Sequence, residues 1–187
     1  MKVESNQYLF DIFKDDVLIQ TFLRHMSNDF VDIVEHNLWF LTHVVSDHAE
    51  IRDQILKSQI FDHCIKTLKQ KEINLELLRN LIWFLCNVCK STETVPPEEK
   101  LKDLVLYFSS FLYTHDNQIL SNCLWGLYYV TQFDENYPNI YNKVVDSGAV
   151  VKILKFDYSK MQLCILPSLR VLGNLLSGKY DVVDVSL

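Results

Sequence analysis

Residues 78–90 read L-R-N-L-I-W-F-L-C-N-V-C-K, and this stretch decides how the chain folds. Almost all of its residues are apolar, as in a helix made for burial. Yet Trp83 is followed four residues later by Asn87, whose amide group is costly to bury without partners. Residues at i and i+4 lie above one another on one helix face. The stretch therefore predicts a helix with one face for the core and another face that carries a tryptophan and an asparagine.

The same pattern recurs along the chain. Similar segments are V-E-H-N-L-W-F-L-T-H-V-V-S (34–46), L-S-N-C-L-W-G-L-Y-Y-V-T-Q (120–132) and P-S-L-R-V-L-G-N-L-L-S-G (167–178), the last with Arg170 in the tryptophan place. Trp39 and Trp83 are 44 residues apart, Trp83 and Trp125 are 42 apart, and Arg170 lies 45 residues after Trp125, by difference of their numbers. A helical repeat of this period is typical of HEAT and armadillo arrays.

The order of elements inside each repeat also recurs. A tryptophan helix is followed by a polar break, a short helix such as E-I-R-D-Q-I-L-K-S (50–58) and a second apolar helix such as F-D-H-C-I-K-T-L (61–68). Three helices per repeat is the armadillo arrangement. The sequence thus predicts an all-α, armadillo-repeat superhelical solenoid in a single domain, 1–187, with repeats at roughly 17–60, 61–103, 104–147 and 148–187. Both ends are expected to expose apolar surface unless residues 1–16 or the tail D-V-V-D-V-S-L (181–187) cover it.

Composition excludes several classes of function. The chain has 187 residues and a net charge of −6, which disfavours non-specific nucleic-acid binding and favours basic partners. Its five cysteines lie in apolar helix-like runs, which predicts reduced thiols in the cytosol or nucleus. No apolar run reaches the roughly 20 residues that a membrane helix needs. No membrane, metal or cofactor is expected.

Polar and aromatic residues share one stripe of each tryptophan helix. These residues are Glu35, Trp39, His43 and Asp47 in the first repeat, Asn80, Trp83 and Asn87 in the second, and Asn122, Trp125 and Tyr129 in the third. An asparagine amide can hold the backbone of an extended peptide, and a tryptophan face can accept a cation and its aliphatic stem. Nearby carboxylates would bind the charged group. The stripe predicts recognition of a basic peptide; the alternative for any single tryptophan is core packing.

The chain resembles the central armadillo repeats of the importin-α (karyopherin-α) family from about residue 17 to 181. The motifs that carry the resemblance most specifically are L-R-N-L-I-W-F-L-C-N-V-C-K (78–90) followed by the P-P loop, I-L-S-N-C-L-W-G-L-Y-Y-V-T (119–131), V-V-D-S-G-A-V (144–150) and P-S-L-R-V-L-G-N-L-L-S-G (167–178). In that family one tryptophan repeat pairs with tyrosine and the next has arginine instead of tryptophan, as in Trp125/Tyr129 and Arg170/Asn174. The resemblance implies a right-handed superhelix whose groove binds nuclear localisation signals (NLS) rich in lysine and arginine.

The resemblance also implies a role for each stripe residue. Trp39, Trp83 and Trp125 would sandwich lysine and arginine stems, Asn87 would hold the main chain, and Asp47 would bind the most important lysine. Glu35 and Asn80 would occupy further groove positions. Arg170 and Asn174 would belong to the zone between the family's two signal sites.

Two residues depart from the family pattern. His43 stands in place of an asparagine and would titrate near neutral pH. Asn122 stands where an acidic residue is usual, which weakens the preference for cations there. The chain also carries no preceding tryptophan repeat, no arginine-rich segment that recruits importin-β and no further C-terminal repeats, so importin-β is expected only as an indirect partner.

The leading prediction is an importin-α-like adaptor that binds basic NLS-bearing cargo in the cytoplasm and nucleus and is not an enzyme. The alternative is a diverged or truncated armadillo scaffold for protein–protein interaction without import, with a homodimer through the exposed end repeats as a further partner. Cys86-x-x-Cys89 lacks the four ligands of a structural zinc site. The aromatic run Tyr107, Phe108, Phe111 and Tyr113 is expected to lie in the core.

Overall fold

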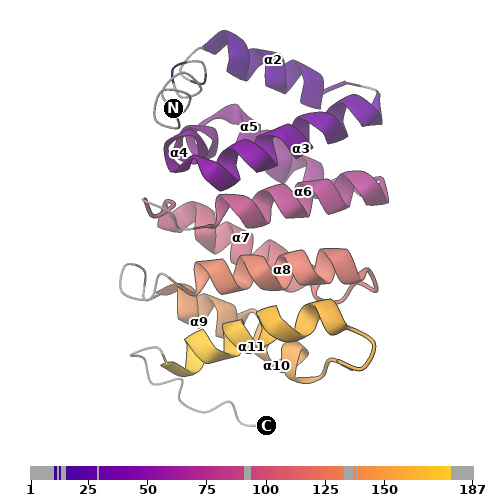
Figure 1. Ribbon diagram of the computed structural model, residues 1–187, viewed down its shortest axis with the longest axis vertical. Coiled ribbons are helices and arrows are strands. Elements are labelled where there is room, and N and C mark those ends of the chain that lie inside the picture. The colour runs from indigo at the N-terminus through magenta and orange to yellow at the C-terminus, as the bar shows by residue number, and fades with distance from the viewer. Residues whose placement is uncertain are drawn as a thin grey trace. The chain divides into compact units, whose positions relative to one another are not determined.

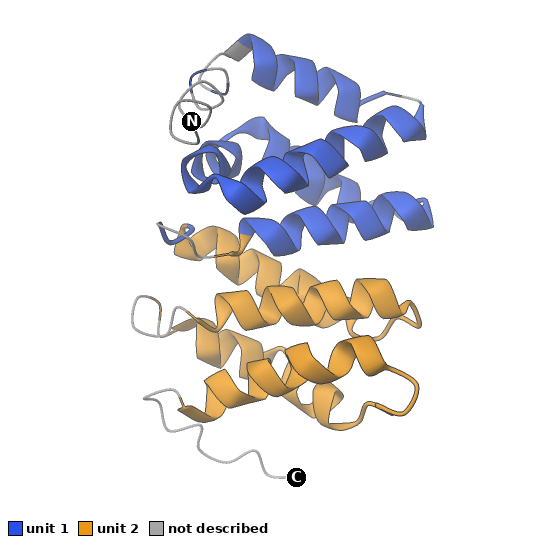
Figure 2. Ribbon diagram, viewed as in Figure 1, with its two compact units in different colours: residues 1–88, 92–96 blue, residues 89–91, 97–187 orange. Residues whose placement is uncertain are grey.

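The computed structural model describes residues 11, 13, 16–28, 30–90, 94–132, 137 and 139–177 (Figure 1). These residues form two compact units, coloured separately in Figure 2. Unit 1 comprises residues 1–88 and 92–96, and unit 2 comprises residues 89–91 and 97–187. Every regular element among the described residues is a helix, in agreement with the all-α prediction. The sequence left open whether residues 1–16 or the tail 181–187 cover the ends; residues 1–10 and the tail lie outside the described residues.

Unit 1 is built around the first tryptophan helix. Its helices are α2 (Asp16–Met26), α3 (Val31–Asp47), α4 (Ala49–Lys57), α5 (Gln59–Leu68) and α6 (Leu75–Val88). Helix α3 packs against α2, α4 and, most extensively, α6. The short helix predicted after the first tryptophan helix is α4, and the second apolar helix is α5. The first two tryptophan helices therefore lie side by side within one unit.

Unit 2 contains the third tryptophan helix and its arginine counterpart. Its helices are α7 (Glu98–Phe111), α8 (Asn117–Val130), α9 (Asn139–Asp146), α10 (Ala149–Leu154) and α11 (Gln162–Ser177). Helix α8 packs against α7 and α11, and α9 packs against α7 and α10. Between α6 and α8 the described residues form one helix, α7, which begins directly after Pro96 and Pro97. Proline interrupts the interior of a helix but is tolerated at its start, so this pair marks the boundary before α7.

Local sequence signals explain several helix boundaries. The Ser58 hydroxyl accepts a hydrogen bond from the Ile60 backbone N–H (3.2 Å) at the start of α5. The Asp116 carboxylate accepts the backbone N–H groups of Gln118 and Ile119 at the start of α8. Such side chains satisfy donors that have no partner inside the helix. Gly148 has φ of 76°, which lets the chain turn between α9 and α10.

The core residues are those that the helical spacing predicts. Leu38, Leu41 and Val45 of α3 are buried, as are Leu81, Leu85 and Val88 of α6. Apolar side chains on the last described helix are exposed, including Leu163, Leu169 and Leu176, as expected for an end repeat. One expectation is wrong: Phe108 is buried, but Tyr113 is 67% exposed because it lies beyond the end of α7, where the Lys152 ammonium lies 4.4 Å from its ring centre.

Candidate peptide-binding site

Three aromatic rings meet on the surface of unit 1. Trp39 and His43 lie one turn apart on α3, and Trp83 lies on the neighbouring helix α6. The centre of the His43 ring is 4.4 Å from that of Trp39 and 5.4 Å from that of Trp83, with interplanar angles of 67° and 86°. Trp39 is 53% exposed and Trp83 is half-buried. The pattern of tryptophan stripes on α3 and α6 thus produces one aromatic cluster.

A pocket adjoins this cluster. It has a volume of about 370 Å³ and is lined by Glu35, His36, Trp39 and Asn80. The backbone of α3 fixes His36, whose Nδ1–H donates a hydrogen bond to the Asp32 carbonyl (2.7 Å). Among the described residues, Glu35 forms no ion pair with any cation. A carboxylate without a cationic partner beside an exposed indole face is suited to a positively charged ligand group. We call Glu35, Trp39, His43, Asn80 and Trp83 the α3–α6 cluster.

The other two predicted site residues of unit 1, Asn87 and Asp47, are not among those that form the α3–α6 cluster. Asn87 is only 6% exposed, and its Nδ2 donates a hydrogen bond to the Trp83 carbonyl at 2.9 Å. This bond satisfies the amide within its own helix and leaves one of its two N–H groups for another acceptor. Asp47 is exposed at the end of α3 and forms no ion pair within the described part of the chain.

Unit 2 holds a second aromatic group on α8. The ring centres of Trp125 and Tyr129 are 6.0 Å apart in a stacked arrangement, and Tyr128 stands edge-on to Trp125 at 5.6 Å. Asn122 lies one turn before Trp125 and is half-buried. Lys90 Nζ lies 6.0 Å from the centre of the Tyr129 ring. This group therefore already has one cation of the chain beside it.

A second cation of the chain, Arg170, lies over the other two rings of this group. The Arg170 guanidinium carbon lies 5.9 Å from the Trp125 ring centre and 5.2 Å from that of Tyr128. Its Nη1 donates a hydrogen bond to the Tyr128 hydroxyl at 3.0 Å. Asn174 Nδ2 donates to the Thr131 hydroxyl at 3.0 Å, which joins α11 to the end of α8. We call Trp125, Tyr128, Tyr129 and Arg170 the α8–α11 cluster.

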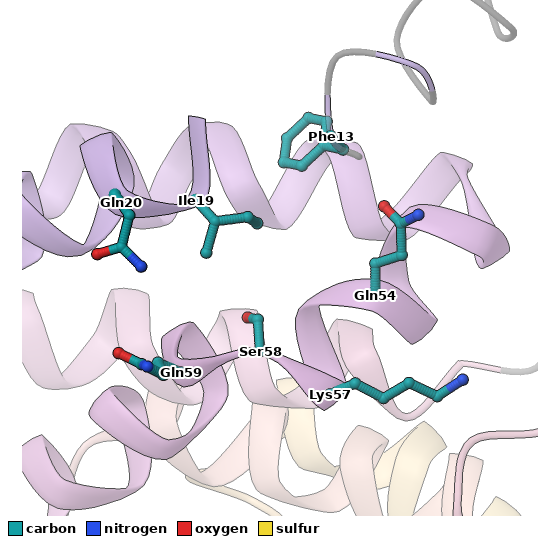
Figure 3. A pocket seen from close by; sticks show the side chains of 7 residues that line it. All are labelled: Phe13, Ile19, Gln20, Gln54, Lys57, Ser58 and Gln59. Atoms are coloured by element: carbon teal, nitrogen blue, oxygen red, sulfur yellow. The ribbon is translucent and has the colours of Figure 1, made fainter. Parts of the chain in front are cut away.

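Sequence reasoning missed Tyr128 and Thr131. The signal for Tyr128 is its place three residues after Trp125, which puts both on one side of α8. The sequence also assigned nothing to a pocket between α2 and the α4–α5 junction, which has a volume of about 440 Å³. Figure 3 shows its lining side chains, which are Phe13, Ile19, Gln20, Gln54, Lys57, Ser58 and Gln59. Gln54 Oε1 is buried there, and no described atom donates a hydrogen bond to it.

The cysteines form no candidate centre in the described residues. All five are buried and none forms a disulfide. Burial raises the pKa of the Cys64 and Cys164 thiols, which keeps them protonated. No group of three or more histidine, cysteine or carboxylate side chains in the described ranges is arranged to hold a metal ion. No described helix is both long and apolar enough to cross a membrane.

The sequence is similar to those of importin α subunits. No protein-family model matches the chain. In sequence it is similar to importin subunit alpha-1b of rice, with 25% identity over 160 residues, and to importin subunit alpha-5 of Arabidopsis thaliana, with 27% identity over 124 residues. The two alignments cover 86% and 66% of this chain but only 29% and 23% of those proteins. The chain thus spans less than a third of the curated relatives it matches.

Solved structures show the fold. A designed armadillo repeat protein in complex with the peptide (KR)4 superimposes with a TM-score of 0.69 at 13% identity, over 84% of this chain and 64% of that one. An engineered protein gives a TM-score of 0.71 at 17% identity, over 88% of this chain and 64% of the other. The chain therefore has the armadillo-repeat fold and resembles importin α subunits over most of its length.

Proposed function

We propose that this chain is an importin-α-like adaptor that binds lysine- and arginine-rich nuclear localisation signals through its tryptophan helices and works in the cytoplasm and nucleus. One observation carries the proposal. The half-exposed Trp39 ring shares a pocket with the carboxylate of Glu35 and the amide of Asn80. A core tryptophan needs neither of those polar neighbours. A ligand with an aliphatic stem and a cationic end can contact the indole ring, the carboxylate and the amide together.

The α3–α6 cluster supplies complementary groups for a basic side chain. The indole face of Trp39 covers a lysine stem and attracts its ammonium, a contact of about 0.5–2 kcal/mol. Glu35 accepts hydrogen bonds from the ammonium, and Asn80 offers both a donor and an acceptor to the peptide backbone. Asp47, exposed one turn beyond His43, extends the negative charge along α3. The net charge of −6 favours the approach of a basic partner.

The comparisons support this class of ligand. The sequence is similar to those of importin α subunits, and a structural neighbour is a designed armadillo repeat protein bound to the peptide (KR)4. Both are binding proteins rather than enzymes. We propose the same for this chain, with basic cargo as the direct partner and importin-β as an indirect one.

A second candidate is an armadillo scaffold that binds a protein partner and imports nothing. The observation that favours it is the state of the aromatic groups. Arg170 already covers Trp125 and Tyr128, and the His43 ring lies between Trp39 and Trp83. If the chain is such a scaffold, these contacts are internal packing, and the chain does not bind basic peptides selectively.

The test is a titration of the chain with a fluorescently labelled lysine-rich signal peptide, read by anisotropy at low and at physiological salt. The adaptor proposal expects saturation at micromolar peptide or below, weaker binding at higher salt, and loss of binding when the key lysine of the peptide is replaced by alanine. The Trp39→Ala variant should bind about tenfold more weakly, in line with a strong cation–π contact.

The matched control is Tyr113→Ala. Tyr113 is also an exposed aromatic residue beside a cation, Lys152, but it lies on unit 2, outside both clusters. Its removal should leave the affinity unchanged. If the wild-type chain binds the lysine peptide and its alanine control equally, the adaptor proposal is wrong and the scaffold alternative is favoured.

A further inference from the structure

We infer that His43 determines whether the α3–α6 cluster accepts a basic side chain, and that it does so through its charge: the neutral imidazole admits a lysine or arginine, and the protonated imidazole excludes it. The inference rests on the proposed function, because it concerns selection of ligands at the same site. It would make basic-peptide binding by this chain depend on pH, because an imidazole can change its charge near neutral pH.

The His43 ring lies close to both tryptophans of the cluster. The His43 ring centre lies within 6 Å of both indole centres, at 4.4 Å from Trp39 and 5.4 Å from Trp83. A cation placed within about 6 Å of an aromatic ring centre is attracted by it. Once protonated, the imidazole is itself a cation beside both tryptophan rings, so it repels a ligand cation that approaches the Trp39 face. His43 is exposed, so a proton reaches the ring from solvent.

Among the residues that the structure describes, His43 has no ion-pair partner for that charge. Charged and titratable residues on α3 and on the helices packed against it include Glu35, His36 and Asp47 on α3, Glu76 and Arg79 on α6, Arg24 and His25 on α2, and Glu50, Arg52, Asp53 and Lys57 on α4. Glu76 is paired with Arg79, and Arg52 with Asp53. Within the described ranges no carboxylate lies within 4.0 Å of the His43 ring nitrogens. The two tryptophans are its ring contacts.

Competition between two cations follows from this arrangement. A lysine ammonium that reaches the Trp39 face lies a few ångströms from the imidazole, and two like charges at about 5 Å repel by roughly 1 kcal/mol in water, more at a partly dry surface. Binding of the peptide therefore favours the neutral form of His43. By reciprocity, a ligand that prefers the neutral form releases protons when it binds near the midpoint of titration.

The experiment measures the Kd of the labelled lysine-rich peptide for the full chain at about pH 7.5 and about pH 5.8, at constant ionic strength; the lower value keeps most carboxylates ionised. The wild-type chain is expected to bind about three- to tenfold more weakly at the lower pH. His43→Asn, which keeps a hydrogen-bond donor and acceptor without the charge, is expected to lose that dependence. His43→Lys holds a permanent charge and is expected to bind weakly at both pH values.

Two controls separate this effect from others. His25→Asn makes the same chemical change on α2, outside the site, and is expected to retain the full pH dependence. Calorimetry near pH 6.5 in two buffers with different ionisation enthalpies is expected to show proton release with wild-type protein and less with His43→Asn.

The outcomes are distinct. Absence of binding by wild type and His43→Asn at both pH values would contradict the proposed function itself. Binding that is selective for the lysine peptide but equal at both pH values would overturn only the role of His43. Retention of the full pH dependence in His43→Asn would also overturn it, and would assign the titration to another group such as His36.

Discussion

The Arg170 guanidinium of α11 lies 5.2 Å from the ring centre of Tyr128 on α8 and donates a hydrogen bond to its hydroxyl. The same guanidinium carbon lies 5.9 Å from the centre of Trp125. One cation of the chain thus occupies the position that a ligand cation would take at the third tryptophan. The two tryptophan clusters are therefore unequal: Trp39 offers an exposed face, whereas Trp125 is half-buried beside an internal arginine.

This inequality predicts unequal effects of two matched substitutions. Trp39→Ala is expected to weaken binding of the lysine-rich peptide about tenfold, because on the proposed function it removes the exposed indole face that the ligand cation contacts. Trp125→Ala is expected to weaken it by less than about threefold, because the cation–π contact there is already made by Arg170. The measurement is peptide anisotropy with both variants at one salt concentration.

Arg170→Gln provides the complementary test. It vacates the Trp125 face, so quenching of tryptophan fluorescence by acrylamide should increase relative to wild type. Equal losses of affinity in Trp39→Ala and Trp125→Ala would show that Arg170 moves aside for the ligand.

A second prediction concerns the carboxylate of the α3–α6 cluster. Glu35→Gln keeps the shape of the side chain but removes its charge, so it should weaken peptide binding about three- to tenfold at low salt and flatten the dependence of log Kd on salt. Salt titrations of peptide affinity measure both. The control is Glu99→Gln on α7, whose carboxylate is highly exposed and lies 3.5 Å from Lys102 Nζ. A salt dependence as steep in Glu35→Gln as in wild type would count against a direct contact with the ligand cation.

The fold could be predicted well from the sequence, because an armadillo array follows from the repeat spacing and from helix geometry. The 42- to 45-residue spacing of the tryptophans identifies a helical repeat, and the i, i+4 spacing separates the buried Leu85 from the stripe that contains Trp83. These signals depend on helix geometry, which every repeat shares.

The details of the site depend on packing between helices, which the spacing of residues along the sequence does not specify. The packing around α6 nearly buries Asn87, whose amide bonds to the Trp83 carbonyl of its own helix. The contact between Arg170 and Tyr128 joins residues 42 positions apart and depends on the side-chain rotamers of both. Tyr113 is exposed because α7 ends at Phe111, two residues earlier than the aromatic spacing suggests.

A third prediction concerns a buried arginine of unit 1. Arg52 on α4 is fully buried, forms an ion pair with Asp53 (2.8 Å) and donates hydrogen bonds to the Thr94 carbonyl and hydroxyl. It therefore fixes the segment that follows α6. Arg52→Ala is expected to lower the free energy of unfolding by about 3 kcal/mol, because Asp53 and Thr94 lose a charged partner in a buried position.

The control for Arg52 is Arg79→Ala, which removes the ion pair with Glu76 on the exposed side of α6. Surface pairs of this kind contribute about 0–1 kcal/mol. Urea unfolding followed by circular dichroism compares the two variants. Equal losses would show that the Arg52 network contributes no more than a surface pair.

A fourth prediction follows from the buried thiol of Cys64. Burial raises its pKa in the folded protein, whereas in the unfolded chain a thiol ionises near its usual value of about 8.5. A raised folded pKa contributes stability that is complete below the unfolded pKa and is lost as the pH rises above it. The contribution of Cys64 should therefore fall by up to about 1.4 kcal/mol per pH unit above pH 9.

The Cys64→Ala variant tests that sign. It is less stable at neutral pH because it leaves a small cavity, but its free energy of unfolding should fall less steeply than that of wild type between about pH 8.5 and 10. Urea unfolding at several pH values under reducing conditions gives the slopes. Parallel slopes for variant and wild type would mean that Cys64 ionises equally in both states.

The fifth prediction concerns two helical glycines in unit 2 that the sequence alone does not distinguish. A Cβ added to Gly126 on α8 would stand 2.5 Å from the ring of Phe108, which is fully buried on α7. A Cβ added to Gly173 on α11 would meet nothing within 4 Å. Gly126→Ala should therefore destabilise the protein by about 1–3 kcal/mol through overpacking, although alanine is the better helix former.

Gly173→Ala should instead stabilise the protein by about 0.5–1 kcal/mol, because it restricts the unfolded chain and improves helix propensity without a clash. Urea unfolding of the two variants and wild type gives both signs. The double variant Gly126→Ala/Phe108→Leu identifies the cause, because the smaller leucine leaves room for the methyl group. It should be more stable than the sum of the two single changes predicts, as expected for residues in direct contact. Simple additivity, or a stabilising Gly126→Ala, would show that α7 and α8 are not packed as closely as this contact requires.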